Sequence, residues 1–107
     1  MSIKFFYNSY NLDENKVVKI EIKNNKLNMY LIMNAHLELI ANGYRPEMDL
    51  DISNVFIFNT YNDDIILDNI SNVYVINCND NEITFNVDGN IIKCYGDIDV
   101  LYKTYSY

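Results

Sequence analysis

The amino-acid sequence predicts an α+β fold that is predominantly antiparallel β-sheet, with about seven to eight short strands in hairpins or a meander and one short helix at about 34–42. Three observations support this prediction. Apolar and polar residues alternate over short runs, two-residue turn signals separate several of these runs, and a single segment shows apolar residues at helical spacing. The length of 107 residues and the 50% hydrophobic composition fit one domain, residues 1–107.

The first half of the chain is expected to begin with a strand at Ile3–Tyr7, followed by a β-hairpin. In the hairpin, the alternating runs 17–23 and 26–33 flank Asn24-Asn25, and asparagine tolerates the positive φ angles that a two-residue turn requires. This turn fixes the register of the two strands. The predicted pairs are Ile22–Leu27, Ile20–Met29 and Val18–Leu31 on one face, and Glu21–Asn28 and Lys19–Tyr30 on the other.

The helix predicted at residues 34–42 follows the hairpin. Apolar residues recur at helical spacing from Met33 to Tyr44, and Asn34 is a suitable N-cap. Gly43 stands where a helix commonly ends, and Pro46 lies just beyond it. We expect this helix to pack on one face of the sheet.

From residue 48 onward the sequence predicts short strands, for which two arrangements are open. Residues 52–59 and 70–77 both begin with Ile-Ser-Asn-Val, and an eighteen-residue echo of this kind would suit the stacked rungs of a solenoid. Against this, Asp88-Gly89 is a favoured two-residue hairpin turn between 82–87 and 90–95. Because the turn signal is the stronger one, we predict an antiparallel meander.

The predicted meander ends in two hairpins. The turn at Asp88-Gly89 pairs Phe85 with Ile92 and Ile83 with Cys94. Gly96-Asp97 is expected to turn the chain once more, before a last strand at residues 98–105.

Charge is distributed unevenly along the chain. Residues 1–48 carry six Lys/Arg and five Asp/Glu, a balance of +1, whereas residues 49–107 carry two Lys and ten Asp/Glu, a balance of −8. A polyanionic half repels nucleic-acid phosphates and attracts basic protein surfaces, so we expect no direct nucleic-acid binding. The competing interpretation is that the carboxylates only keep the protein soluble.

No catalytic or metal-binding motif accompanies this charge. His36 is the only histidine, and Cys78 and Cys94 lack the paired spacing of a zinc site, so both are expected to be small buried thiols. Two Asp-x-Asp pairs, at 49–51 and 97–99, would suit a divalent cation, yet no Gly-rich phosphate loop accompanies them. We therefore predict a non-enzymatic protein without metal or cofactor.

The expected location is the cytoplasm of a bacterial host or a virus-infected cell. No apolar run approaches the roughly 18–20 residues that a membrane span needs, and no segment has the pattern of a secretory signal. The abundance of Asn, Ile, Lys and Tyr is typical of the AT-rich coding DNA of low-GC bacteria, their phages and some viruses.

The leading functional hypothesis is a small acidic inhibitor or interaction protein that binds and blocks a basic, nucleic-acid-handling protein, such as a nuclease or a CRISPR effector. Phage anti-CRISPR proteins and immunity proteins are two classes that share this character. Carboxylates would steer the partner, and tyrosines would anchor it. The predicted partner-binding residues are Asp63, Asp64, Asp68, Asp80, Glu82, Asp97, Asp99, Tyr61, Tyr74, Tyr95 and Tyr102.

Three other functions stay open. The eighteen-residue echo and the Tyr-rich end at 102–107 would suit a self-associating structural or assembly protein of a phage or virus. The Asp-x-Asp carboxylates would suit a metal-dependent enzyme. A small-molecule pocket between helix and sheet would leave no motif in the sequence.

Overall fold

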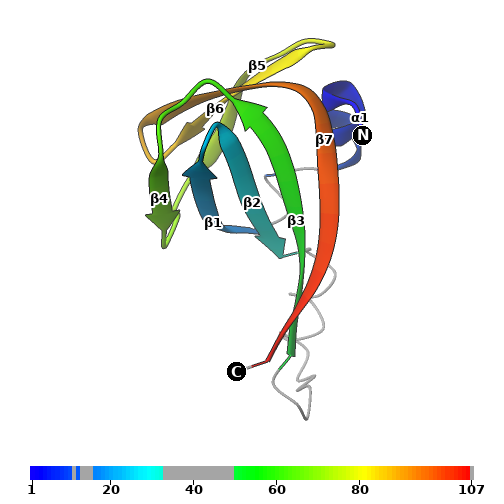
Figure 1. Ribbon diagram of the computed structural model, residues 1–107, viewed down its shortest axis with the longest axis vertical. Coiled ribbons are helices and arrows are strands. Elements are labelled where there is room, and N and C mark those ends of the chain that lie inside the picture. The colour runs from blue at the N-terminus through cyan, green and yellow to red at the C-terminus, as the bar shows by residue number, and fades with distance from the viewer. Residues whose placement is uncertain (11, 13–15, 33–49, 107) are drawn as a thin grey trace.

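The computed structural model describes residues 1–10, 12, 16–32 and 50–106, with the backbone alone at 16, 32, 50–53 and 102–106. Within these ranges seven strands form one antiparallel sheet in the order β4-β1-β2-β3-β7-β6-β5, accompanied by one short helix (Figure 1). The predicted α+β class is therefore confirmed. The helix predicted at 34–42 lies outside the described residues. The elements are α1 (Ile3–Ser9), β1 (Lys16–Lys23), β2 (Lys26–Ile32), β3 (Leu50–Thr60), β4 (Ile65–Asp68), β5 (Val73–Cys78), β6 (Glu82–Val87) and β7 (Asn90–Ser106).

The β1–β2 hairpin has the predicted turn and most of the predicted register. Asn24 and Asn25 have φ angles of 51° and 59°, as a two-residue turn of this type requires. From the turn to Lys19–Tyr30 the pairs are those that the sequence predicts. Beyond them, a β-bulge pairs Val17 rather than Val18 with Leu31, so the predicted Val18–Leu31 pair is wrong.

The N-terminal segment is a helix, and the prediction of a strand at Ile3–Tyr7 is wrong. The side chain of Ser2 accepts a hydrogen bond of 3.1 Å from the Phe5 N–H and so caps the helix. Ile3 and Phe6 are buried while Phe5 and Tyr7 are exposed, which is a helical spacing of three rather than an alternation of two. Phe6 then packs edge-to-face on Phe56 and Phe58 of β3, at centroid distances of 4.9 and 5.2 Å.

The strands of the second half are antiparallel, as predicted, but only β5, β6 and β7 follow one another as a meander, since β4 pairs with β1 and β3 pairs with β7. β6 and β7 meet at Asp88-Gly89, and the observed register includes both predicted pairs, Phe85–Ile92 and Ile83–Cys94. All strand pairs in the described part of the chain are antiparallel, so the solenoid alternative is excluded there. The sequence echo has no structural counterpart, since residues 52–55 lie inside β3 while 70–72 precede β5.

β7 is one continuous strand, and the predicted turn at Gly96-Asp97 is wrong. Gly96 has the positive φ of 74° that suggested a turn, but the chain bends there instead of reversing. The register against β3 shifts at this bend, where Ile57 pairs with Asp99 and Asn59 pairs with Tyr95. The first part of β7 pairs with β6 and the rest runs along β3, so one strand joins the two halves of the sheet (Figure 1).

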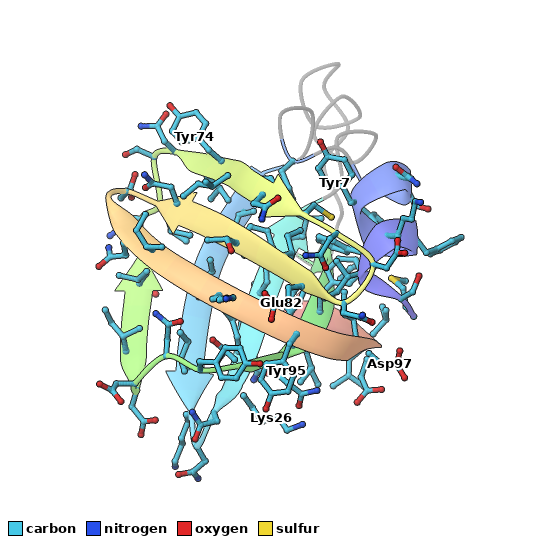
Figure 2. The ribbon with its side chains drawn as sticks, turned by 90° about the horizontal axis from the view of Figure 1, so that it is seen from above. Tyr7, Lys26, Tyr74, Glu82, Tyr95 and Asp97 are labelled. Carbon is cyan, nitrogen blue, oxygen red and sulfur yellow. The ribbon has the colours of Figure 1, made fainter. Side chains whose placement is uncertain are left out.

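The sheet is strongly curled, because its two edge strands are consecutive in the chain. β4 and β5 stand at opposite edges and are joined by residues 69–72 alone. In a flat sheet of this size the edges would lie about 29 Å apart, at about 4.8 Å per strand spacing. Five residue steps reach at most about 18 Å. Figure 2 shows the result: β6 and the first part of β7 cross over β1 and β2.

One hydrophobic core fills the space inside this curled sheet. It is formed by the inward faces of the strands, together with two residues of α1 that close it at one end. The buried members are Ile3, Phe6, Val17, Ile20, Ile22, Leu27, Met29, Leu31, Phe56, Phe58, Ile83, Phe85, Val87, Ile92, Cys94 and Ile98.

Candidate functional site

Two tyrosines, one exposed and one half-buried, form a stacked pair on the face of the sheet opposite the core. Tyr61 follows the end of β3 and Tyr95 lies in β7, and their rings stack with centroids 4.4 Å apart and planes 24° from parallel. Tyr61 remains 58% exposed. Lys93 lies opposite Tyr61, whose N–H donates to the Lys93 carbonyl, and Glu82 of β6 is the register partner of Tyr95. We call Tyr61, Tyr95, Lys93 and Glu82 the tyrosine platform.

The loop that carries Tyr61 is fixed to β7 on both sides of the tyrosine. The Thr60 hydroxyl donates to the Lys93 carbonyl at 2.7 Å, and the Tyr61 N–H donates to the same oxygen at 3.3 Å. The Asn62 side chain accepts from the Lys93 N–H at 3.0 Å and donates to the Ile91 carbonyl at 2.8 Å. Asn62 thus pairs with the free edge of β7 as a neighbouring strand would, so the position of Tyr61 is set before any partner arrives.

Lys93 connects the acidic and aromatic parts of the platform. Its Nζ lies 3.2 Å from a carboxylate oxygen of Glu82 and 6.0 Å from the centroid of the Tyr61 ring. Next to Tyr95, the Asn59 side chain accepts a hydrogen bond from Lys26 of β2. Asn59 also lies against Gly96, where an added Cβ would come within 3.3 Å of its Nδ2.

Three of the predicted carboxylates lie close to the platform tyrosines along the chain. Asp97 lies at the bend of β7 just after Tyr95, Asp99 follows on the same strand, and Asp63 lies in the loop that carries Tyr61. All three are exposed and make no ion pair with the side chains that the structure describes. Figure 2 shows Glu82, Tyr95 and Asp97 on the same side of the molecule, with Lys26 nearby.

The other predicted carboxylates lie away from the platform and contact other elements. Asp64 accepts a hydrogen bond of 3.0 Å from the Asn24 N–H and so ties the loop to the tip of the β1–β2 hairpin. Asp68 ends β4 opposite Lys19, and Asp80 lies 3.6 Å from Lys4 of α1. These residues are not part of the platform.

Three lysines of the first half lie on one hairpin, where Glu21 of the same hairpin and Asp68 of β4 are neighbours of Lys19. Lys19, Lys23 and Lys26 lie on the hairpin β1–β2, directly beside β3 in the sheet. A hydrogen bond to the Glu21 side chain raises the pKa of Lys19. The chain-order contrast of +1 and −8 does not become a simple polarity across the sheet, because β4 with Asp68 borders the hairpin and Lys93 lies on β7.

The predicted tyrosines do not form one surface. Tyr74 lies on the edge strand β5, well away from Tyr95 in Figure 2, and is 57% exposed. It lines a groove of about 540 Å³ between α1 and β5. The backbone of Tyr102 pairs with Asn54, and its side chain lies outside the described residues. The groove is lined by Phe6, Tyr7, Asn8, Tyr10, Leu12, Val73, Tyr74 and Val75.

Cys94 is buried, as predicted, whereas Cys78 is only half-buried, so the expectation of a buried thiol is wrong there. Burial raises the pKa of the Cys94 thiol to about 12, and burial together with nearby Asp80 raises that of Cys78. A thiol with a raised pKa is a poor nucleophile and a poor metal ligand, since both roles need the thiolate. Among the residues described, no group of three or more His, Cys, Asp or Glu could hold a metal ion. His36 and Asp49 lie outside the described residues, and Asp51 is described by its backbone alone.

Sequence reasoning missed the residues that build the platform around Tyr61. Thr60, Asn62 and Lys93 carried no recognisable pattern, because they meet only when the loop after β3 lies against β7. The turn at Asp88-Gly89 could have predicted part of the platform, because it sets the register of β6 and β7 and so places Lys93 and Tyr95 on the same face.

No family model, curated protein sequence or solved structure matches this chain. Within the described residues there is also no helix of the length and apolar character that a membrane crossing requires.

Proposed function

We propose that this protein is a non-enzymatic inhibitor or interaction protein that binds a basic, nucleic-acid-handling protein, such as a nuclease or a CRISPR effector, through the tyrosine platform. It blocks the nucleic-acid channel of that partner by occupying it. The setting is that of an anti-CRISPR-like or immunity-like protein in the cytoplasm of a bacterial host or an infected cell.

One observation supports this proposal above the others: the stacked pair of Tyr61, which is exposed, and Tyr95, which is half-buried, is held by the fold, and exposed carboxylates without ion-pair partners among the described side chains follow each tyrosine in the chain. Tyr61 is held in place by the hydrogen bonds of Thr60 and Asn62, so little side-chain or loop entropy is lost on binding. Exposed tyrosines with this geometry are typical interface anchors. Asp97 and Asp99 give the electrostatic attraction that speeds encounter with a basic surface.

The partner can be tested by photo-crosslinking at the platform. We expect a benzophenone amino acid at position 61 to capture a basic protein from the native host, and the same group at position 74 to capture much less of it. Tyr74 is a matched control because it is equally exposed but lies elsewhere. Once the captured protein is identified, its complex with the unaltered inhibitor should dissociate when the DNA or RNA that the captured protein binds is added. Addition of the inhibitor should also lower the nucleic-acid cleavage or binding of the captured protein. Capture of a neutral or acidic protein, or a complex indifferent to nucleic acid, contradicts the proposal.

The charge can be tested on the same partner with two variants of equal charge change. Asp97→Asn combined with Asp99→Asn should slow association and flatten its salt dependence between about 50 and 200 mM, where screening changes strongly. Asp68→Asn combined with Asp80→Asn removes the same two charges away from the platform and should have the smaller effect. Equal effects of the two pairs would mean that net charge alone, and not this site, attracts the partner.

A second candidate, self-association through a sheet edge, is favoured by one observation. The short edge strand β4 exposes Ile65 and Ile66, with Ile66 60% exposed. Exposed apolar edges are templates for pairing with another chain. Sedimentation of a single monomeric species across a hundredfold range of concentration would rule this candidate out.

A further inference from the structure

We infer that the tyrosine platform is a receptor for an arginine side chain of the partner and that it prefers a guanidinium to an ammonium group. This inference rests on the proposed function and deepens it, because it states the chemistry by which the basic partner is recognised.

The platform already holds a cation within the protein itself. The Lys93 ammonium lies 3.2 Å from a Glu82 carboxylate oxygen and 6.0 Å from the centroid of the Tyr61 ring. A cation over an aromatic face with a carboxylate beside it is the arrangement by which proteins bind cationic side chains. Lys93 therefore shows which kind of group this surface attracts.

The flat geometry favours arginine. Tyr95 covers one face of the Tyr61 ring and Lys93 Nζ lies 6.0 Å from its centroid, yet Tyr61 is still 58% exposed, so part of the ring stays open to a partner. A planar guanidinium can stack on such a ring and still direct its remaining N–H groups sideways to carboxylates. A lysine ammonium lacks the plane, so it cannot make both contacts equally well.

Acceptors for those N–H groups are present on the same side. Asp63 is two residues from Tyr61 in the same loop, and Asp97 and Asp99 follow Tyr95 on β7; all three are exposed and have no ion-pair partner among the described side chains. Glu82, by contrast, is already engaged by Lys93. The aromatic face supplies the selectivity for arginine, and the free carboxylates supply attraction for any cation.

Two peptides of equal charge separate these two contributions. Fluorescently labelled deca-arginine and deca-lysine are titrated with the protein at about 50 mM salt, and binding is followed by anisotropy. We expect deca-arginine to bind roughly two- to fivefold more tightly, which is the scale of one exposed cation–π contact. Tyr61→Leu should bring this ratio close to one, Tyr61→Phe should keep most of it, and Tyr74→Leu should leave it unchanged.

A measurement on the unaltered protein makes the test independent of variant folding. In NMR titrations, the ring-proton resonances of Tyr61 and Tyr95 should shift further with deca-arginine than with deca-lysine, while those of Tyr74 stay in place. Equal affinity of the two peptides, or a ratio that Tyr74→Leu lowers as much as Tyr61→Leu, overturns the arginine preference and leaves the proposed function standing. Failure of both peptides to bind at low salt overturns the proposed function itself.

Discussion

Replacing Asp88 by Asn tests how the curled sheet is closed. Asp88 occupies the β6–β7 turn with φ of 48°, and its two carboxylate oxygens accept hydrogen bonds from Ser71 and Asn72, at 3.0 and 2.9 Å. Its own N–H donates to the Asn72 carbonyl at 3.0 Å. These contacts hold the segment that joins the edge strands β4 and β5. Asn-Gly is as good a turn as Asp-Gly, so this substitution keeps the turn and changes only the acceptor.

The expected cost follows from the number of acceptors lost. Asn has one acceptor oxygen, so one of the two backbone N–H groups turns to water and the other loses its charged partner. A net hydrogen bond is worth about 1 kcal/mol, and one to a charged group somewhat more. Because the site is exposed, we expect a loss of about 1–1.5 kcal/mol in the free energy of unfolding, or roughly 4–10 °C in the melting temperature of a domain of this size.

Urea unfolding followed by circular dichroism measures this loss, with Asp97→Asn as the control. Asp97 carries the same charge in an exposed position but has no ion pair among the described side chains, so its neutralisation should change stability by less than about 0.5 kcal/mol. If Asp88→Asn were as stable as the unaltered protein, or if Asp97→Asn lost as much, the connection would not depend on this carboxylate.

Three further predictions concern stability. Gly89→Ala should lower the free energy of unfolding by about 1–2 kcal/mol, because Gly89 has a positive φ and open space around it. Gly96→Ala should lower it by more, because an added Cβ also comes close to the Asn59 side chain, and urea unfolding of both variants measures the difference. Phe6→Ala should destabilise by about 3–5 kcal/mol in the same assay, because it leaves a cavity against β3. Burial raises the pKa of Cys94 from 9.0 to about 12, so above pH 9 the unfolded state loses the thiol proton while the folded state keeps it. The free energy of unfolding is therefore unaffected by this group below pH 9 and falls as the pH rises from 9 to 12. Cys94→Val should show less loss of stability between pH 9 and 12 than the unaltered protein, and equal losses would contradict the assignment.

Local turn chemistry made part of the fold predictable. Asn24-Asn25 and Asp88-Gly89 each fix a hairpin, and a two-residue turn determines which residues share a face. The same reasoning failed at Gly96, because a positive φ suits both a turn and a bulge, and only pairing with β3 selects the bulge. It failed at Ile3–Tyr7 because a short apolar run fits a strand as well as a helix.

The candidate site was predictable in its residue types and not in its arrangement. Tyr61, Tyr95 and Asp97 were expected at a partner-binding surface on the grounds of charge and aromatic content, and the structure brings them to one side of the sheet. Tyr74 was expected with them but lies on the edge strand β5. Strand order decides this, and strand order depends on contacts between residues far apart in the chain.

The sequence by itself determined the sheet, two hairpins and the acidic character of the second half, because turns, alternation and charge are properties of neighbouring residues. Tertiary structure alone decided that β7 runs on past Gly96 along β3, that the edges curl together around Asp88, and that Lys93 meets Tyr61. These features follow from burying one common core between two halves of a single sheet, and no local pattern records that requirement. In the polyanionic half, the fold brings Tyr61 and Tyr95 together as a stacked pair, while Asp63, Asp97 and Asp99 stay exposed.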